Sequence, residues 1–360
     1  MLSTGCRQER RLRIALTADP EIPVPPLHYG GIERIVDLLA HGLVSLGHEV
    51  TLFANPASAT AGQLIPWRGQ QSSSKFDTVC NATTLARHVW SGRFHLVHSF
   101  SRVAYLLPLL PLPIPKLMTY QRQISRRSVK LGHALSRGSL WFSAISSQMM
   151  GGVRDVGTWR MVYNGVPLAV YDVSLDPGPN APLVFVGRVE ELKGPHLAIE
   201  IARRSGFPLI IAGNVPAEHR DFFDAKIKPH LNGSQVTYLG PVDDKAKNVL
   251  LGHARALLMP ILWEEPFGIV MAEAMACGTP VIGFARGAVP EVVEHGVTGF
   301  VGTDLDGLVA AVPLVDRISR AACRARVEQL FSDRVVVRAY ENVYREMLAT
   351  GVKCQAGKLR

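Results

Sequence analysis

Short apolar segments alternate with amphipathic helical runs along most of this 360-residue chain. Residues 12–18 and 48–54 are apolar segments of strand length, and a helical run over residues 32–46 lies between them. The pattern restarts at residues 183–186 and continues to about residue 332. Strands that alternate with helices in this way build parallel sheets whose faces are covered by helices. The chain is therefore predicted to be an α/β protein.

The length and the restart of the pattern favour two Rossmann-like domains. We predict an N-terminal domain over residues 1–166, a proline-rich linker over 167–181, a C-terminal domain over 182–332 and a terminal helix and tail over 333–360. Such domains bind ligands at the carboxyl ends of their strands, so we expect the site in a cleft between them. The further predicted elements are strands at 96–100, 116–120, 140–145, 161–163 and 208–212, and a helix at 196–205.

Residues 264–282 carry two carboxylates, Glu265 and Glu273, separated by seven residues. Between them, Gly268 lies in a turn that runs into a segment of good helix formers. The start of a helix presents free backbone N–H groups and the positive end of the helix dipole, and such a site binds phosphate. Carboxylates accept hydrogen bonds from hydroxyl groups. The combination indicates a site for a sugar nucleotide.

A second anion-binding element follows the apolar segment 183–186. There Gly187 lets the backbone approach a ligand closely, and Arg188 and Lys193 supply a planar guanidinium and a point charge. A diphosphate is bound well by such a pair. The P-loop pattern is absent, which excludes a P-loop nucleotide site.

Together, Gly187-Arg188…Lys193-Gly194 and the Glu265/Glu273 pair resemble the retaining glycosyltransferases of family 4 (glycosyl transferases group 1), which have the GT-B fold. Weaker matching motifs occur in the same order along the chain: Gly30-Gly31-Ile32-Glu33, Tyr163-Asn164-Gly165-Val166, Ile210-Ile211-Ala212-Gly213, Val236-Thr237-Tyr238-Leu239-Gly240, Gly287-Ala288-Val289-Pro290-Glu291 and Gly296-Val297-Thr298-Gly299-Phe300. The resemblance also implies that the terminal helix packs back on the N-terminal domain.

The resemblance implies roles for individual residues. Arg188 and Lys193 would hold the diphosphate, and Glu265 would contact the donor sugar; these three are the predicted catalytic residues. Glu273 would accept hydrogen bonds from the ribose hydroxyls. The other predicted donor-binding residues are Gly30, Gly31, Gly187, Phe267, Gly268, Ile269 and Val270. For Phe267, packing under the turn is the commoner role of such a residue.

The acceptor side departs from the family pattern. Family members usually carry a histidine after the strand at 116–120, where this chain has Gln121 followed by Arg122. His98 is a family-like position at the end of the preceding strand. Together with Arg126, these residues form the predicted acceptor set. The spacing of Arg122, Arg126, Arg127 and Lys130 places several of them on one helical face, which indicates an acceptor pocket for a phosphate or carboxylate, or a contact with a membrane surface. The alternative is an ordinary solvated basic helix.

The charge is unevenly distributed. The net charge is +9, but residues 1–166 hold 18 Lys and Arg against 8 Asp and Glu, and residues 78–154 hold no acidic residue at all. Such a surface attracts an anionic partner: a phosphorylated or lipid-linked acceptor, or an anionic membrane. A solvated basic face is the alternative, and we expect no nucleic acid partner.

Five scattered cysteines and the lack of an apolar leader favour the cytoplasm, with peripheral contact at the inner membrane face left open. The predicted activity is transfer of a sugar, with retention, from a UDP-, GDP- or ADP-linked donor to a hydroxyl acceptor. No metal or other cofactor is expected, because Arg188, Lys193 and the N–H groups of the helix start would supply the electrostatic stabilisation. The resemblance implies that the leaving phosphate acts as the base. An epimerase or hydrolase of the same fold, and a non-catalytic basic binding protein, remain the alternatives.

Overall fold

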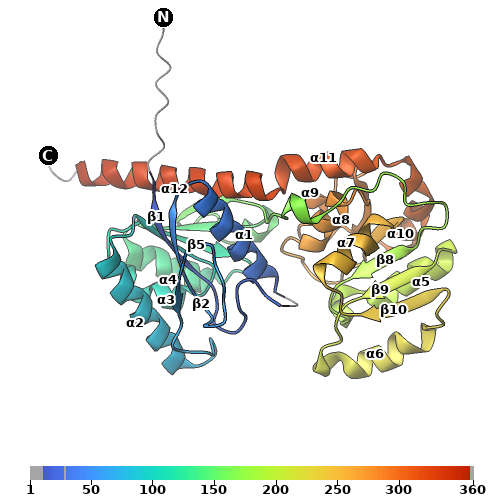
Figure 1. Cartoon of the computed structure of the whole chain (residues 1–360), viewed down its shortest axis with the longest axis horizontal. Coiled ribbons are helices and arrows are strands. Elements are labelled where there is room, and N and C mark those ends of the chain that lie inside the picture. Colours follow the sequence, from blue (N-terminus) through green and yellow to red (C-terminus); the bar gives the residue numbers. More distant parts are fainter. Residues whose placement is uncertain (1–10, 28–29, 357–360) are drawn as a thin grey trace, which may run out of the picture. The chain divides into compact units, whose positions relative to one another are not determined.

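The computed structural model describes residues 11–27 and 30–356, which form two compact units (Figure 1). The first comprises the described residues up to Ala144, Gly152–Arg160 and those from Val337 onward; the second comprises Ile145–Gly151 and Met161–Val336. Residues 1–10, 28–29 and 357–360 of the predicted domain and tail lie outside the described residues. Each unit is built on one parallel sheet, so the predicted pair of Rossmann-like sheets is confirmed.

The first unit contains a seven-stranded sheet in the order β3-β2-β1-β4-β5-β6-β7. Its strands are β1 (Arg13–Thr17), β2 (Glu49–Ala54), β3 (Gln63–Pro66), β4 (Leu96–Ser99), β5 (Lys116–Tyr120), β6 (Leu140–Ala144) and β7 (Thr158–Met161). The strand predicted at 161–163 was misplaced, because the ring of Tyr163 packs 5.2 Å from that of Phe331 in the second unit instead of extending the strand.

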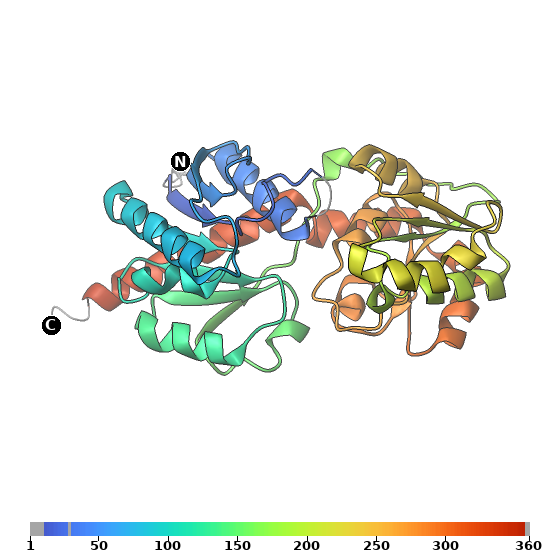
Figure 2. The same ribbon diagram turned by 90° about the horizontal axis from the view of Figure 1, so that it is seen from below.

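The helices of the first unit are α1 (Gly31–Ser45), α2 (Lys75–Gly92), α3 (Val103–Leu106), η1 (Leu107–Leu109) and α4 (Arg126–Ser136). The connections from β3 to β4, β4 to β5 and β5 to β6 all run in one direction across the sheet, and that from β1 to β2 runs in the other. Right-handed crossovers therefore place α2, α3 and α4 on one face and α1 on the opposite face. Figure 1 and Figure 2 show α2 and α4 over the same face, with the segment of α3 and η1 between them.

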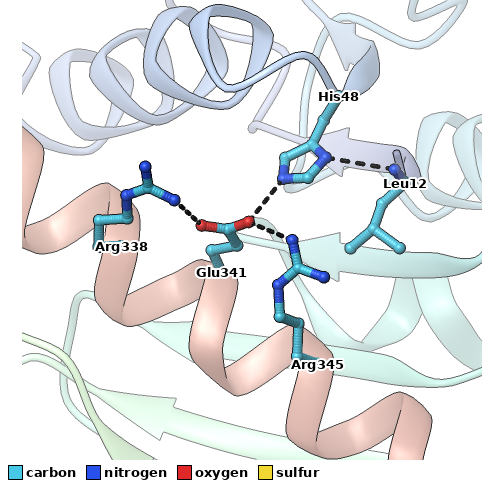
Figure 3. Close-up of polar contacts among 5 residues, drawn as sticks. All are labelled: Leu12, His48, Arg338, Glu341 and Arg345. Atoms are coloured by element: carbon cyan, nitrogen blue, oxygen red, sulfur yellow. Dashed lines mark hydrogen bonds and ion pairs between the residues drawn. The ribbon is translucent and has the colours of Figure 1, made fainter. Parts of the chain in front are cut away.

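The long helix α12 (Asp333–Ala356) belongs to the first unit from Val337 onward. It lies against α1, where a Cβ on Gly42 would approach Val337 Cγ2 to 2.3 Å. Glu341 of α12 is buried and accepts hydrogen bonds from Arg338 and Arg345, and its Oε1 lies 3.2 Å from His48 Nε2 (Figure 3). Burial alone would raise the pKa of Glu341, but these donors hold it below its ordinary value.

Lys116, at the start of β5, is fully buried although lysine is almost never found there without a carboxylate partner. Its ammonium donates hydrogen bonds to the carbonyl oxygens of Leu112 and Ile114, each at 2.8 Å. Burial lowers the pKa of this amine from its ordinary 10.5 to about 7.

This burial predicts a pH-dependent stability. The unfolded chain keeps the Lys116 proton up to about pH 10, whereas the folded chain loses it near pH 7. Between these values the unfolded state binds more protons, so the free energy of unfolding rises with pH. We expect the free energy of unfolding of the wild type to rise between about pH 7 and about pH 9.5, and Lys116→Met to reduce this rise by an amount on the order of 2–4 kcal/mol. Urea unfolding at the two pH values measures it. Exposed Lys130→Met is the matched control, and an unchanged pH slope in Lys116→Met would contradict the account.

The second unit has a six-stranded parallel sheet in the order β10-β9-β8-β11-β12-β13. Its strands are β8 (Leu183–Val186), β9 (Leu209–Ala212), β10 (Val236–Gly240), β11 (Ala256–Met259), β12 (Val281–Phe284) and β13 (Gly299–Gly302). Its helices are α5 (Pro195–Ser205), α6 (Arg220–Lys226), α7 (Asp244–Gly252), α8 (Ile269–Ala276), α9 (Val289–Val292), α10 (Leu305–Ala311) and α11 (Arg320–Leu330). The 3-10 segments are η2 (Gln148–Met150), η3 (Leu168–Val170), η4 (Glu191–Lys193), η5 (Ala217–His219), η6 (Lys228–His230) and η7 (Val312–Arg317).

Strand order in the second unit reverses between β8 and β11, which pair directly. In sheets of this kind, ligands bind outside the carboxyl ends of the two strands at the reversal. Of the helices in the described part of the chain, none is both long and apolar enough to cross a bilayer.

Candidate functional site

The residues predicted to bind the donor in the second unit follow the two strands at the reversal point. The segment after β8 carries Gly187, Arg188 and Lys193, and the segment after β11 carries Glu265 and Gly268. Because β8 and β11 are neighbours in one parallel sheet, both segments leave the sheet at the same edge. The fold thus gathers residues that are far apart in the sequence.

The start of α8 is open to a ligand. Gly268 precedes the helix at φ 74°, a conformation that favours glycine, and among the described residues no side chain caps the helix. The N–H groups of Ile269 and Val270 belong to the first turn, where an α-helix offers no acceptor of its own. Met271 and the rest of α8 are buried, so the helix is held firmly with only its first turn accessible.

Lys193 and Glu265 form an ion pair beside this helix start. Lys193 Nζ lies 2.7 Å from Glu265 Oε2, and the carboxylate is nine-tenths buried. The ring of Trp263 lies 4.7 Å below the ammonium, and its indole N–H donates to the same carboxylate oxygen at 3.1 Å. A cation and an acceptor are therefore fixed next to each other by three mutually supporting contacts.

Arg188 lies on the other strand's segment and is one third exposed. Its Nη2 donates to Glu190 Oε1 at 2.9 Å, and Glu190 Oε2 lies 3.4 Å from His219 Nε2. Gly187 leaves space in front of the strand, since a Cβ there would meet nothing closer than 3.9 Å. The neighbouring Gly213 has no such freedom: its Cβ would lie 1.8 Å from the carbonyl oxygen of Gly187.

Glu273 is buried in the second turn of α8 and holds two partners that sequence reasoning missed. Its Oε1 accepts a hydrogen bond from the Tyr171 hydroxyl at 2.7 Å and one from Lys247 Nζ at 2.6 Å. Lys247 also lies 3.2 Å from Asp244 Oδ1. The sequence could have indicated that Lys247 has a partner, because Lys247 lies on the apolar face of α7 with Leu250 and Leu251, where a charge needs a buried partner.

Glu264 and Glu265 have different partners, although they are adjacent. Glu264 Oε2 accepts hydrogen bonds from the backbone N–H of Gly287 at 2.7 Å and from Gln148 Nε2 at 3.2 Å. Glu265, by contrast, faces Lys193, and its carbonyl accepts the N–H of Ala288 at 2.8 Å. The Gly287 turn thus fixes the backbone of the segment that presents Glu265.

The prediction that Phe267 contacts the donor is wrong for its side chain. Phe267 is 1% exposed and belongs to the core of the second unit, with its ring 5.5 Å from Phe331 and 6.0 Å from Tyr163. An apolar residue inside this turn is drawn into the core below it, while the flanking polar residues stay near the surface.

In the first unit, Gly30 and Gly31 lie where α1 begins. A Cβ on Gly30 would clash with Pro26 Cβ at 2.6 Å and with Glu33 Oε2 at 2.9 Å. Glu33 and Asp19 are both more than nine-tenths buried near this turn, and burial raises the pKa of each carboxyl group. Gly30 is therefore required for close packing of the turn against Glu33.

The prediction that His98 contacts the acceptor is also wrong. The imidazole is completely buried, its Nδ1 lies 2.6 Å from the Tyr344 hydroxyl and its Nε2 lies 2.7 Å from Thr119 Oγ1. Burial lowers the pKa of His98 well below its ordinary value. Position in sequence could not reveal this, because Tyr344 reaches His98 only through the docking of α12 on the sheet.

The remaining acceptor candidates lie after β5. Gln121 is half-buried at the end of the strand, and Arg122 Nη2 lies 3.6 Å from Asp19 Oδ2. Because α4 begins only at Arg126, Arg122 is not on the helix, whereas Arg126, Arg127 and Lys130 are. Arg126 Nη1 donates to Asp155 Oδ1 at 2.6 Å, and this bond holds the pKa of Asp155 at about 2.

One Asp-x-Asp sequence, Asp304-Leu305-Asp306, has the pattern that ligates metal in some glycosyltransferases. Asp304 instead caps α10 by accepting the N–H of Gly307 at 2.8 Å, and Asp306 pairs with Arg204 at 2.7 Å. Among the residues that the structure describes, no three His, Cys, Asp or Glu side chains are arranged to hold a metal ion.

Comparison with known proteins identifies two family matches that cover successive parts of the chain. Residues 29–170 match the family described as Glycosyltransferase Family 4, and residues 173–312 match Glycosyl transferases group 1. The D-inositol 3-phosphate glycosyltransferase of Mycobacterium marinum is 30% identical over 174 residues. This alignment covers 47% of the present chain but only 37% of the relative.

Solved structures share the fold over nearly the whole chain. The sucrose-phosphate synthase of Thermosynechococcus elongatus superposes with a TM-score of 0.77 at 21% identity, covering 94% of this chain and all of the other. Anabaena Alr3699/HepE, solved in complex with UDP-glucose, superposes with a TM-score of 0.71 at 18% identity, covering 94% of this chain and 100% of the other. At these identities the likeness concerns the fold, which is that of GT-B glycosyltransferases.

Proposed function

Because the chain belongs to glycosyltransferase family 4 (glycosyl transferases group 1), we propose that it moves a sugar, with retention, from a nucleoside diphosphate sugar to a hydroxyl acceptor. The donor would be bound by the domain predicted over residues 182–332, and the acceptor by that over 1–166. The observation that carries the proposal is the open start of α8, with Lys193–Glu265 on one side and Glu273 in the next turn.

The proposed chemistry assigns charge stabilisation to this site. As the glycosidic bond breaks, negative charge grows on the leaving diphosphate. Arg188, Lys193 and the N–H groups of Gly268, Ile269 and Val270 would stabilise it, so that no metal is required. The leaving phosphate would then take the proton of the acceptor hydroxyl. Glu265 would accept a hydrogen bond from a sugar hydroxyl, and Glu273 would do the same for the ribose.

The comparisons and the charge support a choice of donor and acceptor classes. HepE was solved with UDP-glucose, so UDP-glucose is the first donor to test for this chain. The basic first unit and the name of the M. marinum relative favour a phosphorylated polyol or another anionic acceptor, which includes a lipid-linked one. Gln121 and Arg122 are the proposed acceptor contacts, and action at the cytoplasmic membrane face is part of the same proposal.

The proposal is tested by donor turnover with and without acceptor. UDP release from UDP-glucose should rise at least tenfold when a panel of phosphorylated polyols is added, the new anomeric bond should keep the donor's configuration, and EDTA should change neither result. Equal UDP release without acceptor would instead indicate a hydrolase, and conversion of the donor into an epimeric nucleotide sugar without net UDP release would indicate an epimerase. A lack of turnover with UDP-, GDP- and ADP-linked donors would favour the non-catalytic alternative.

A further inference from the structure

The outer face of α2 carries large apolar side chains that no other part of the described chain covers. Phe76, Val79 and Trp90 are 76%, 63% and 71% exposed. Their spacing of three and eleven residues places them on one stripe of the helix, together with Thr83 and Arg87. The opposite face of α2 is already packed on the sheet through buried residues such as Leu85 and Val89, so the stripe is not the core-facing side.

The neighbouring elements on the same face of the sheet continue this apolar surface. Leu107 of η1 is 43% exposed, and Leu131 and Leu135 of α4 are 53% and 43% exposed. Leu131 and Leu135 are four residues apart and therefore share one side of α4. Both helices cover the same face of the sheet (Figure 2), and each exposes large apolar side chains to solvent.

Cations surround these apolar side chains without acidic residues among them. Apart from Arg126, which is paired with Asp155, the exposed cations of α2, α4 and their ends are Lys75, Arg87, Arg93, Arg127, Lys130 and Arg137. No Asp or Glu occurs from residue 78 to 154. At the margins, Asp77 accepts the N–H groups of Gln70 and Gln71, and Asp155 is paired with Arg126. We call the exposed residues of α2, η1 and α4 named here the α2–α4 surface.

An open hollow lies at the C-terminal end of the stripe. It has a volume of about 470 Å³ and is lined by Arg87, His88, Trp90 and Ser91. A guanidinium beside an exposed indole is suited to a phosphate headgroup whose glycerol and acyl carbons contact the ring.

We propose that the α2–α4 surface is a docking surface for an anionic lipid bilayer. An interfacial helix combines bulky apolar side chains, which enter the headgroup boundary, with cations that contact anionic lipid, and the α2–α4 surface has both. Nucleic acid would use the cations, but the aliphatic Val79, Leu107, Leu131 and Leu135 would remain without a partner. The inference assigns a surface to the proposed action at a membrane face, but it does not depend on the sugar transfer, because none of these residues belongs to the site described above.

The test is co-sedimentation of the full chain with vesicles of phosphatidylcholine alone and with about 30% phosphatidylglycerol at low salt. Binding is expected to the anionic vesicles only and to weaken with salt. Phe76→Ser/Trp90→Ser and Arg127→Glu/Lys130→Glu should each reduce binding roughly tenfold or more. The matched controls are Leu239→Ser/Val297→Ser and Lys226→Glu/Lys245→Glu, which likewise replace two apolar side chains by Ser and two cations by Glu, at exposed positions of the second unit. Circular dichroism verifies that every variant is folded.

Tryptophan fluorescence locates the contact. Trp90 is 71% exposed, whereas the other four tryptophans are 36% exposed or less, so anionic vesicles should shift the emission to the blue. Trp90→Phe should retain vesicle binding but lose the shift. Unchanged binding of both α2–α4 variants would overturn the proposal, as would equal binding to neutral vesicles. Binding of a labelled oligonucleotide but not of vesicles would assign the surface to nucleic acid and overturn it as well.

Discussion

Arg188→Ala should lower kcat by two to three orders of magnitude, because removal of one group that stabilises developing charge has an effect of roughly that size. Arg188 is accessible from solvent and is oriented by the buried Glu190, so its guanidinium is positioned before any ligand binds. Arg188→Lys should recover only part of the rate, since lysine keeps the charge but not the planar fork. The measurement is steady-state UDP release from UDP-glucose.

Arg203→Ala is the matched control for this prediction. Arg203 is an exposed arginine of α5 that also pairs with a nearby glutamate, Glu200, but it lies outside the proposed site. Its loss should leave kcat unchanged. A folded Arg188→Ala variant with near-normal turnover would refute the diphosphate role of Arg188, whatever reaction the protein catalyses.

Gly287→Ala should abolish most activity and destabilise the protein, although Gly287 is not proposed to touch the donor. Its added Cβ would lie 2.3 Å from the backbone nitrogen and oxygen of Glu265, so the segment that presents Glu265 to Lys193 must move. The φ of 57° adds strain for any residue with a Cβ, about 1 kcal/mol. Thermal unfolding and kcat are the two measurements.

Gly296→Ala is the control that separates the effect of displacing Glu265 from the effect of backbone strain. Gly296 also has a positive φ, of 77°, but a Cβ there would meet no atom within 4 Å. We expect Gly296→Ala to cost stability of about 1 kcal/mol and to leave kcat nearly normal. If Gly287→Ala were folded and kept a kcat as near to normal as that of Gly296→Ala, the position of Glu265 would not matter for turnover, and its predicted catalytic role would fail.

The structure also changes how Glu273 should be tested. Because Glu273 neutralises the buried Lys247, Glu273→Ala would leave an unpaired buried cation as well as an empty space. A loss of nucleotide binding in that variant would then have two explanations. Glu273→Leu combined with Lys247→Met removes both charges together and leaves no acceptor at position 273, and is the variant that isolates hydrogen bonding to the ribose.

Local patterns made much of the second unit predictable. The useful patterns each lie within a short stretch of chain: the apolar segment at 183–186 with the glycine that follows it, and the spacing of Glu265 and Glu273. The sheet brings these stretches together where its strand order reverses. The rules of sheet topology were sufficient to predict this arrangement, because only a few strand orders are common for parallel strands connected by helices.

Contacts between distant segments account for the errors. Tyr171 and Lys247 reach Glu273 from the predicted linker and from α7, and Tyr344 reaches His98 from the last helix. None of these pairs has a spacing that a sequence pattern can reveal. A buried polar position, such as Lys247 on the apolar face of α7, predicts that a partner exists but not which residue it is.

The most direct test of the central claim is calorimetric titration of UDP, GDP and ADP into the wild-type chain and into Arg188→Ala. The account predicts that one of the three nucleoside diphosphates binds the wild type without added metal, and that Arg188→Ala binds it at least tenfold more weakly. If none of the three binds the folded wild-type chain, the open start of α8 is not a nucleoside diphosphate site and the proposed donor chemistry is wrong.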